Sequence, residues 1–431
     1  MNIRTPRLLM LLLLALAMAS APACREEENP EDTMTPGEEV INTDYTGEEE
    51  PRAVVPEDVP LEEIDLPLEQ IGEDSGSGGM TYAAILSGYY ILRVQQDDGL
   101  FGYEYTIADG SWSEDNVIHR QCGSTITQAW MYRVTKREEF LISAQRALIA
   151  IYAQTEELDD GSLFLRDLGG VSLLAIATSL VAIHGGVDEY DEELEKLGAY
   201  ILARVDEDGK ISGGDSLFLK QGQAMQALEH LHAYTGEEVY LDALERSTKW
   251  LIANPEEHKY GPYMALWNNE PMTYLYNLRP DPEIAELVYE LSDRIVAQQH
   301  TPENHDKESY IGGYYIDPEK PVPSWSTCLF LEAVADGLRM ARIAGDEERL
   351  ETYAESSTLA AKYLLDLQFR KGEKQDAHDP DFINGGVPFT KSGTVIRVDV
   401  PHHVANAVLK TIEYQHLEDF PGRRELDEIA P

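Results

Sequence analysis

The chain has few cysteines and few basic residues, and both shortages exclude classes of protein. Its 431 residues include three cysteines, Cys24, Cys122 and Cys328, and no Cys-x-x-Cys pair, which excludes a disulfide framework and a zinc ribbon. Lysine and arginine total 34 against 79 aspartates and glutamates, for a formal net charge of −45. Because such a charge repels phosphate backbones and anionic lipid surfaces, we expect no nucleic-acid partner.

Long apolar runs are lacking except at the N-terminus. Arg4 and Arg7 precede an apolar run over residues 8–18, and small residues then lead to Cys24, which is the pattern of a secretory signal. The end Ala21-Pro22-Ala23-Cys24 resembles the lipobox of bacterial lipoproteins. That resemblance implies acylation of Cys24 and a membrane-anchored lipoprotein in the bacterial periplasm or on the cell surface; plain cleavage of the signal is the alternative.

The next segment, residues 25–78, has too little apolar surface to form a core. It contains repeated acidic blocks, several prolines and only two basic residues, Arg25 and Arg52, so we expect a disordered spacer. An acidic docking or calcium-sequestering tail is the alternative. We expect residues 79–418 to form the folded domain and residues 419–431 a short C-terminal tail.

A repeat runs through the folded part. Six loops share an acidic or polar lead, a glycine and then an apolar or aromatic residue, and their glycines lie 62, 48, 52, 51 and 73 residues apart. The glycines are Gly99, Gly161, Gly209, Gly261, Gly312 and Gly385. A period near 50 residues indicates a repeat architecture, in which each unit is one supersecondary motif.

Each loop separates two segments of helical periodicity. Those that precede the loops, predicted at residues 80–96, 137–155, 189–204, 238–253, 282–299 and 347–368, mostly carry charge on one face. Those that follow, predicted at 117–135, 169–186, 217–234, 264–278, 322–345 and 400–416, include several that are apolar or small nearly all round. The alternation predicts an all-α (α/α)6 toroid, with an inner ring enclosed by an outer one. An open tetratricopeptide-type solenoid is disfavoured, because its period is about 34 residues.

One unit carries a family resemblance. Gln221-Gly222-Gln223-Ala224, followed by Thr235-Gly236-Glu237-Glu238, resembles the helical repeat of bacterial six-hairpin glycosidases and of the C-terminal domain of glucuronyl C5-epimerases. The resemblance covers about 30 residues closely. It implies a toroid that acts on polysaccharides, many of them acidic, with residues at one end of the ring.

Carboxylates at that end suggest glycoside hydrolysis. The reaction needs one carboxylic acid and one carboxylate about 5 to 9.5 Å apart. Asp399 and Asp167 are the predicted acid/base pair, and Glu270, Asp379 and Asp381 are further candidates for the same end. Asp399 is also placed to cap the following helix, so capping alone is its alternative role.

Basic and aromatic residues suggest a second chemistry. A uronate lyase or epimerase neutralises a sugar carboxylate with arginine and removes the adjacent proton with histidine or tyrosine, and His119 and His402 are the predicted histidines. The predicted substrate-binding residues are Arg120, Gln121, Arg166, Gln221, Trp267, Tyr314, Trp325 and Arg397. Paired arginines that lock the ring and aromatics that wedge helices apart are the structural alternatives.

No cofactor or metal motif is present. GxxxxGK[ST], GxSxG and HExxH are missing, and Cys122 and Cys328 lack the Cys-His-Gly pattern of zinc-binding toroids. We therefore expect an exported carbohydrate-active protein without cofactor or metal. It would act on a polysaccharide or oligosaccharide, and hydrolysis is the leading reaction. A lyase or epimerase is the first alternative, and a surface lipoprotein that binds a glycan or partner without catalysis is the second.

Overall fold

The computed structural model describes residues 77–213, 220–258 and 262–415. The predicted signal sequence, Cys24, most of the acidic spacer and the C-terminal tail lie outside these described residues.

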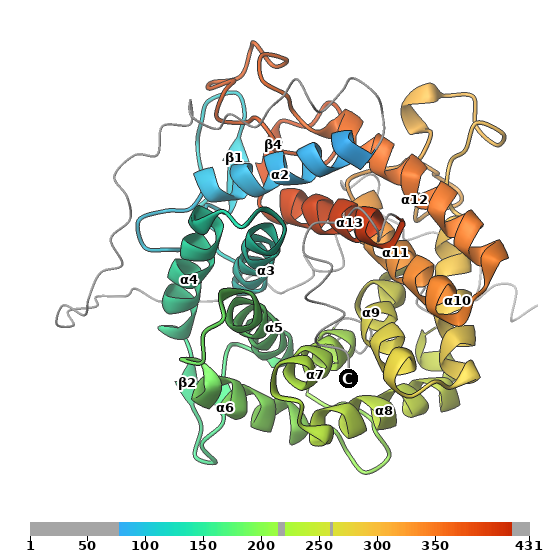
Figure 1. Ribbon diagram of the computed structural model, residues 1–431. Helices are drawn as coiled ribbons and strands as arrows, with labels where there is room; N and C mark the ends of the chain where they lie inside the picture. Colours follow the sequence, from blue (N-terminus) through green and yellow to red (C-terminus); the bar gives the residue numbers. More distant parts are fainter. Residues whose placement is uncertain (1–76, 214–219, 259–261, 416–431) are drawn as a thin grey trace, which may run out of the picture. The chain divides into compact units, whose positions relative to one another are not determined.

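Twelve long helices of the described residues form two concentric rings (Figure 1). The outer helices are α2 (Ser77–Arg93), α4 (Glu138–Tyr152), α6 (Asp191–Leu202), α8 (Glu238–Ala253), α10 (Pro282–Val296) and α12 (Glu347–Leu367). The inner helices are α3 (Ile118–Thr135), α5 (Leu168–Gly185), α7 (Gly222–Thr235), α9 (Pro262–Leu278), α11 (Thr327–Ala344) and α13 (Asp399–Gln415). Each inner helix packs on the next, and α13 packs on α3. The predicted (α/α)6 toroid is confirmed.

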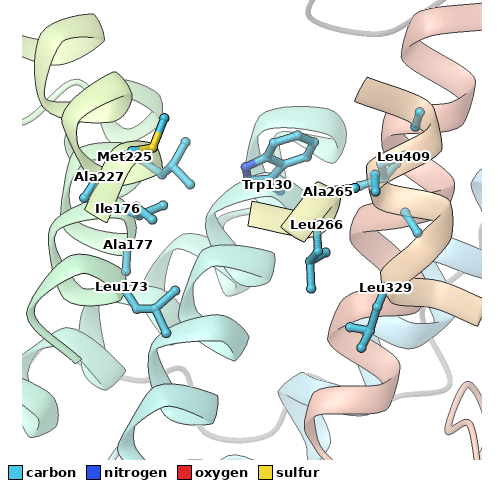
Figure 2. Close-up of a cluster of buried hydrophobic side chains, with 14 of the residues drawn as sticks. Trp130, Leu173, Ile176, Ala177, Met225, Ala227, Ala265, Leu266, Leu329 and Leu409 are labelled. Carbon is cyan, nitrogen blue, oxygen red and sulfur yellow. The ribbon is translucent and has the colours of Figure 1, made fainter. Parts of the chain in front are cut away.

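The apolar pattern accounts for the two rings. In α10 the buried residues Ile284, Leu287, Leu291 and Ile295 recur at helical spacing, so one stripe is covered and the rest faces solvent. In α5 every residue from 168 to 182 is buried. This helix is apolar enough to cross a membrane by composition, but 83% of it is buried within the fold, as in the core helix of a globular protein. Figure 2 shows apolar side chains of the inner helices gathered in the core.

Two short strands connect the first and last loops. β1 (Glu104–Thr106) pairs antiparallel with β4 (Val395–Arg397), and Glu104 lies opposite Arg397. A second small ribbon joins β2 (Glu156–Glu157) to β3 (Leu163–Phe164), and short 3-10 helices span Pro255–His258 and Glu308–Tyr310.

Two helix starts differ from the prediction. The inner helix α7 begins at Gly222 rather than near residue 217, and residues 217–219 lie outside the described residues. The last inner helix but one, α11, begins at Thr327 rather than near residue 322. Pro321 and Pro323 lie in the intervening stretch, and a proline disfavours helical backbone at the residue before it. The later start places Trp325 in the loop that leads into α11.

The glycines of the repeat have a common conformation. Gly99, Gly161, Gly209, Gly312 and Gly385 have φ angles between 82° and 92°, where a side chain is strained. Gly261 lies outside the described residues. At four of the five, an added Cβ atom would overlap a backbone carbonyl of a neighbouring outer helix: Arg146 for Gly99, Arg246 for Gly209, Leu359 for Gly312 and Leu86 for Gly385. The space around Gly161 is open. The glycines therefore let four loops lie directly on the outer ring.

His184, in the last turn of α5, is expected to make stability depend on pH. Burial, together with the nearby charges of Arg133 and Lys136, lowers the pKa of His184 to about 3. The unfolded chain takes up a proton below about pH 6.5, whereas the folded chain does not until about pH 3, so acid favours unfolding. Lowering the pH from 8 to 5 should therefore reduce the free energy of unfolding by about 2 kcal/mol through this residue alone.

The variant His184→Gln tests this expectation. Urea unfolding at pH 8 and pH 5 should show a smaller acid loss in the variant than in the natural protein, by about 2 kcal/mol. An equal acid loss in the two proteins would mean that His184 is protonated in the folded state.

Candidate functional site

The inner helices begin at one end of the ring, which we call the mouth. Side-chain contacts join their first residues: Arg120 of α3 reaches Asp399 of α13, and His119 of α3 reaches Asp167 before α5. Lys220, just before α7, also reaches Asp167. Residues far apart in the sequence therefore meet at the mouth.

Asp399 is the centre of a buried arginine cluster with Arg397 and Arg120. Arg397 donates from Nε to Oδ1 and from Nη2 to Oδ2, both at 2.7 Å, and Arg120 donates from Nε to Oδ2 at 3.0 Å. Asp399 is 1% exposed and each arginine 5%. Bidentate pairs of this kind are the strong class of ion pair. The three side chains form one rigid unit.

This geometry corrects the predicted role of Asp399. Burial raises the pKa of its carboxyl, but Arg397 and Arg120 lower it by more, so the net pKa lies well below the usual range. Both oxygens are engaged by guanidinium groups, so the carboxylate is not free to give or take a proton. Asp399 therefore anchors two arginines, which argues against the predicted acid or base role.

The arginines are held by aromatic rings as well. The guanidinium carbon of Arg397 lies 5.4 Å from the ring centroid of Trp325 and 4.8 Å from that of Phe389. Arg120 donates to the hydroxyl of Tyr103. Cation–π contacts and hydrogen bonds therefore fix both predicted substrate-binding arginines in place. Trp325 packs on Arg397 in a partly buried position.

A second cluster at the mouth joins His119, Asp167 and Lys220. His119 Nε2 lies 2.9 Å from Asp167 Oδ1, and Lys220 Nζ lies 3.1 Å from Asp167 Oδ2. The side chains of His119 and Asp167 are each 17% exposed, in contrast to the buried arginine cluster. A polar group that is both oriented and open to solvent can meet a substrate, so this cluster is the better site for chemistry.

Asp167 stays ionised in this cluster. Burial raises the pKa of Asp167, but His119, the backbone N–H of Gly170 and Lys220 together lower it well below the usual range. The same carboxylate caps α5, since Gly170 N–H donates to Oδ1 at 2.9 Å. Asp167 thus caps α5 and orients His119 at the same time.

Gly169 makes room for the cluster. A Cβ atom at this position would lie 3.2 Å from His119 Nε2, 3.3 Å from Asp167 Oδ1 and 2.5 Å from the side-chain oxygen of Gln223. These polar groups therefore surround the first turn of α5 closely, and a side chain at position 169 would displace them. Gln223 belongs to the same site.

Two adjacent histidines of α13 also lie near the mouth. His402 is 3% exposed, and its Nδ1 lies 3.4 Å from Ser124 Oγ. Burial and neighbouring His403 hold the pKa of His402 well below its ordinary value, so its ring is neutral. His403 Nδ1 lies 2.7 Å from Glu332 Oε1, and both side chains are 9% exposed. His403 and Glu332 make a second histidine–carboxylate pair, deeper than the first.

Two predicted substrate-binding residues are structural instead. The amide of Gln121 accepts from Phe101 N–H at 2.7 Å and donates to Phe101 O at 2.8 Å, and its side chain is fully buried. The hydroxyl of Tyr314 lies 2.7 Å from Ser356 Oγ, and the residue is also fully buried. Neither side chain is available to a ligand, because it is buried and its polar atoms already hold a loop in place.

The other predicted binding residues differ in exposure. Arg166 is exposed, with a left-handed φ of 58° immediately before Asp167. Gln221 Nε2 and Trp267 Nε1 are buried donors that have no hydrogen-bond partner among the described residues. Trp267 is partly buried and meets the ring of His403 edge-on. A polar ligand at the mouth would supply acceptors for such donors.

Three further predictions of position are also corrected or limited. Glu270 lies well inside α9, where it is 4% exposed and pairs with Lys410 Nζ at 2.9 Å, so it is not at the mouth. Asp379 is exposed, and its Oδ1 accepts from the backbone N–H groups of Asp381 and Phe382, which is a turn. Cys122 and Cys328 are free and fully buried.

Sequence reasoning missed several residues of the site. They lie within the first two turns of the inner helices or just before them: Lys220, Gln223, Glu332 and His403. Nothing in their spacing says which face of a helix each one occupies. Glu104 is also new: it is partly buried opposite Arg397, and burial raises its pKa although Arg397 opposes the rise. The only sequence signal for Glu104 is its position just after the first glycine loop.

Comparisons with known proteins agree on the fold. No protein-family model and no curated protein sequence matches the chain. Among solved structures, an unsaturated glucuronyl hydrolase specific for heparin superposes with a TM-score of 0.58 at 12% identity, covering 80% of this chain and 100% of that one. A D-mannose isomerase gives 0.57 at 12% identity, covering 79% and 99%. An α-mannanase of glycoside hydrolase family 76 from Bacteroides thetaiotaomicron gives 0.55 at 13%, covering 81% and 99%. The chain therefore shares the helical toroid fold of these three structures, as the resemblance implied.

Proposed function

We propose that the protein is an exported carbohydrate-active enzyme in which His119 exchanges a proton with a sugar bound at the mouth. The observation that carries this proposal is the partly exposed contact between His119 and Asp167. The neighbours in fold include a hydrolase, an isomerase and a mannanase by name, and sugars are common to all three. The proposed substrate is a polysaccharide or oligosaccharide, and the proposed location is outside the cytoplasm.

The geometry supports a distinct role for each residue of the histidine cluster. Ionised Asp167 accepts a hydrogen bond from the Nε2–H group of His119, which leaves the lone pair on Nδ1 as the base. A carboxylate that orients an imidazole in this way is the usual support for a general base. Lys220 adds a positive charge beside Asp167 and suits a sugar that bears a carboxylate. Removal of a proton from a sugar carbon, as in an epimerase, isomerase or lyase, follows from these roles.

Hydrolysis is the second candidate, and Glu104 is the observation that favours it. A glycosidase needs a general acid whose carboxyl pKa is raised, and burial raises the pKa of Glu104, although Arg397 opposes the rise. Asp167, with its lowered pKa, would be the ionised partner. Asp399 is unsuited to either role.

The variant His119→Gln should separate catalysis from binding. We expect kcat to fall by about 100-fold or more, because a positioned acid or base contributes about 10² to 10⁴. The melting temperature should stay within a few degrees, since His119 is not part of the core. The measurement is NMR of uronate-containing and mannose-containing oligosaccharides incubated with the soluble domain in D2O.

The products distinguish the reactions, and a second histidine serves as control. Epimerisation or isomerisation introduces deuterium at carbon, a lyase gives an unsaturated product that absorbs in the ultraviolet, and hydrolysis adds water. His232→Gln changes a histidine in the last turn of α7, away from the mouth, and should keep full activity. Binding of the sugars without any conversion would support the non-catalytic alternative and sink the proposal.

A further inference from the structure

Below the mouth, the inner ring encloses a buried group of charged residues that the proposed reaction does not use. Lys410 Nζ pairs with Glu270 Oε2 at 2.9 Å and with Asp336 Oδ2 at 3.0 Å. Glu229 and His230 of α7 lie beside them. At about 1.5 Å per residue, Glu229 and Glu270 are roughly 10 to 12 Å from the starts of their helices, so this group is distinct from the histidine cluster.

Three of these residues converge on one point. Glu229, His230 and Glu270 each offer one atom that could bind a metal ion, and these three atoms lie within 4.8 Å of one another. Ligand atoms around a bound zinc ion lie about 3 to 4 Å apart. The three ligand atoms would therefore need to move roughly 1 Å closer to one another to bind the ion. All three side chains are buried, at 5%, 8% and 4% exposure.

Glu229 is the feature that points to a ligand. Its Oε2 is buried and has no hydrogen-bond partner within the part of the chain that the structure describes. A buried carboxylate oxygen normally has a partner, and isolated burial of such a group is costly. Lys410 and Arg339 are near enough to attract Glu229 electrostatically, but Lys410 is engaged by the other two carboxylates and neither cation donates a hydrogen bond to Glu229 Oε2.

The contacts of Glu270 leave it free to bind an ion. Gln226 and Lys410 both donate to Oε2 of Glu270, and the described residues provide no hydrogen bond to its Oε1. Hydrogen bonds to one carboxylate oxygen orient the other toward a metal in many protein sites. Lys410 and Gln226 would therefore act as the outer shell of such a site.

We propose that Glu229, His230 and Glu270 bind a divalent transition-metal ion of the zinc class in the interior of the ring. An imidazole nitrogen with two carboxylate oxygens suits zinc, iron or manganese better than calcium or magnesium, which prefer oxygen alone. Three protein ligands leave a position open for water or a ligand. This site goes beyond the proposed function and does not depend on it, because the ion can bind whether or not His119 is catalytic.

Metal titration of the purified full chain tests the proposal. After treatment with EDTA, the protein should bind one equivalent of Zn²⁺ in competition with a chromogenic chelator, and Co²⁺ should give the visible absorption of a low-symmetry site. Equimolar Ca²⁺ or Mg²⁺ should not displace the Zn²⁺. Glu229→Gln and His230→Asn should each weaken binding by about 100-fold while keeping the helical circular dichroism.

A second histidine pair provides the matched control. The rings of His300 and His305 lie 4.2 Å apart in a loop, where His300 is buried and His305 is partly buried, and this pair is the other place at which zinc could bind adventitiously. His305→Ala should leave the tight site unchanged. Zinc binding that survives both Glu229→Gln and His230→Asn, or that disappears in His305→Ala, overturns the proposal, as does the absence of stoichiometric binding. Because none of these measurements uses turnover, their failure is separate from a failure of the proposed function.

Discussion

Replacing Asp399 with asparagine is expected to lower the free energy of unfolding by about 3 to 5 kcal/mol, the usual cost of removing one partner from a buried ion pair. The variant removes the carboxylate that Arg397 and Arg120, each 5% exposed, both contact at hydrogen-bond distance. Asparagine keeps the size of the side chain, so the loss is electrostatic rather than a cavity. Urea unfolding at pH 7 measures it.

The pH dependence of the loss has a definite sign. Because the folded state holds the pKa of Asp399 well below its unfolded value, the carboxylate stabilises the fold fully above the ordinary aspartate range. That stabilisation is lost as the pH falls through the folded pKa. The difference in stability between natural protein and Asp399→Asn should therefore be constant near neutrality and shrink only in strong acid.

Two further variants make the Asp399 prediction specific. Asp242 pairs with Arg279 on the surface and its side chain is 54% exposed, so Asp242→Asn should cost no more than about 1 kcal/mol. The double variant Arg120→Met, Asp399→Asn should lose less than the sum of its single variants, because each removes the other's partner. A stable Asp399→Asn protein that has lost activity would instead return Asp399 to a catalytic role.

The fold could be predicted because its signals are local. The helical spacing of apolar residues lies within short windows, and the glycine loops recur at a regular period. Each predicted helix is found within a few residues of its expected ends, apart from the late starts of α7 and α11. Closure follows from the same repeat, since each unit must bury its apolar face on the next. Nothing local, however, reveals that β4 pairs with β1, because pairing is a long-range contact.

The site could be predicted only in outline, for the same reason. Arg120 and Asp399 are 279 residues apart, and His403 and Glu332 are 71 residues apart. Sequence reasoning placed acids and bases at the correct end of the ring but not their pairing, which decides whether Asp399 is an acid or an anchor. It also misplaced Glu270, because the depth of a side chain depends on where its helix begins relative to its neighbours.

Gly385→Ala is expected to show how the last loop closes the ring onto the first helix. Gly385 has a φ of 86°, where alanine costs about 1 to 2 kcal/mol. A Cβ atom would also overlap the carbonyl oxygen of Leu86 in α2, and relieving that contact adds about 1 to 3 kcal/mol. The carbonyl of Gly385 accepts hydrogen bonds from Ser87 and Gln368, so moving the loop would strain these bonds as well.

Gly161→Ala is the matched control for this loss. Gly161 has nearly the same φ, 82°, but nothing lies within 4 Å of its added Cβ, so alanine there should cost only the conformational part, about 1 to 2 kcal/mol. Urea unfolding of the two variants should thus differ by at least about 1 kcal/mol, with Gly385→Ala the less stable. Equal losses would show that the last loop yields without disturbing α2, and that the contact between Gly385 and Leu86 does not hold the ring closed.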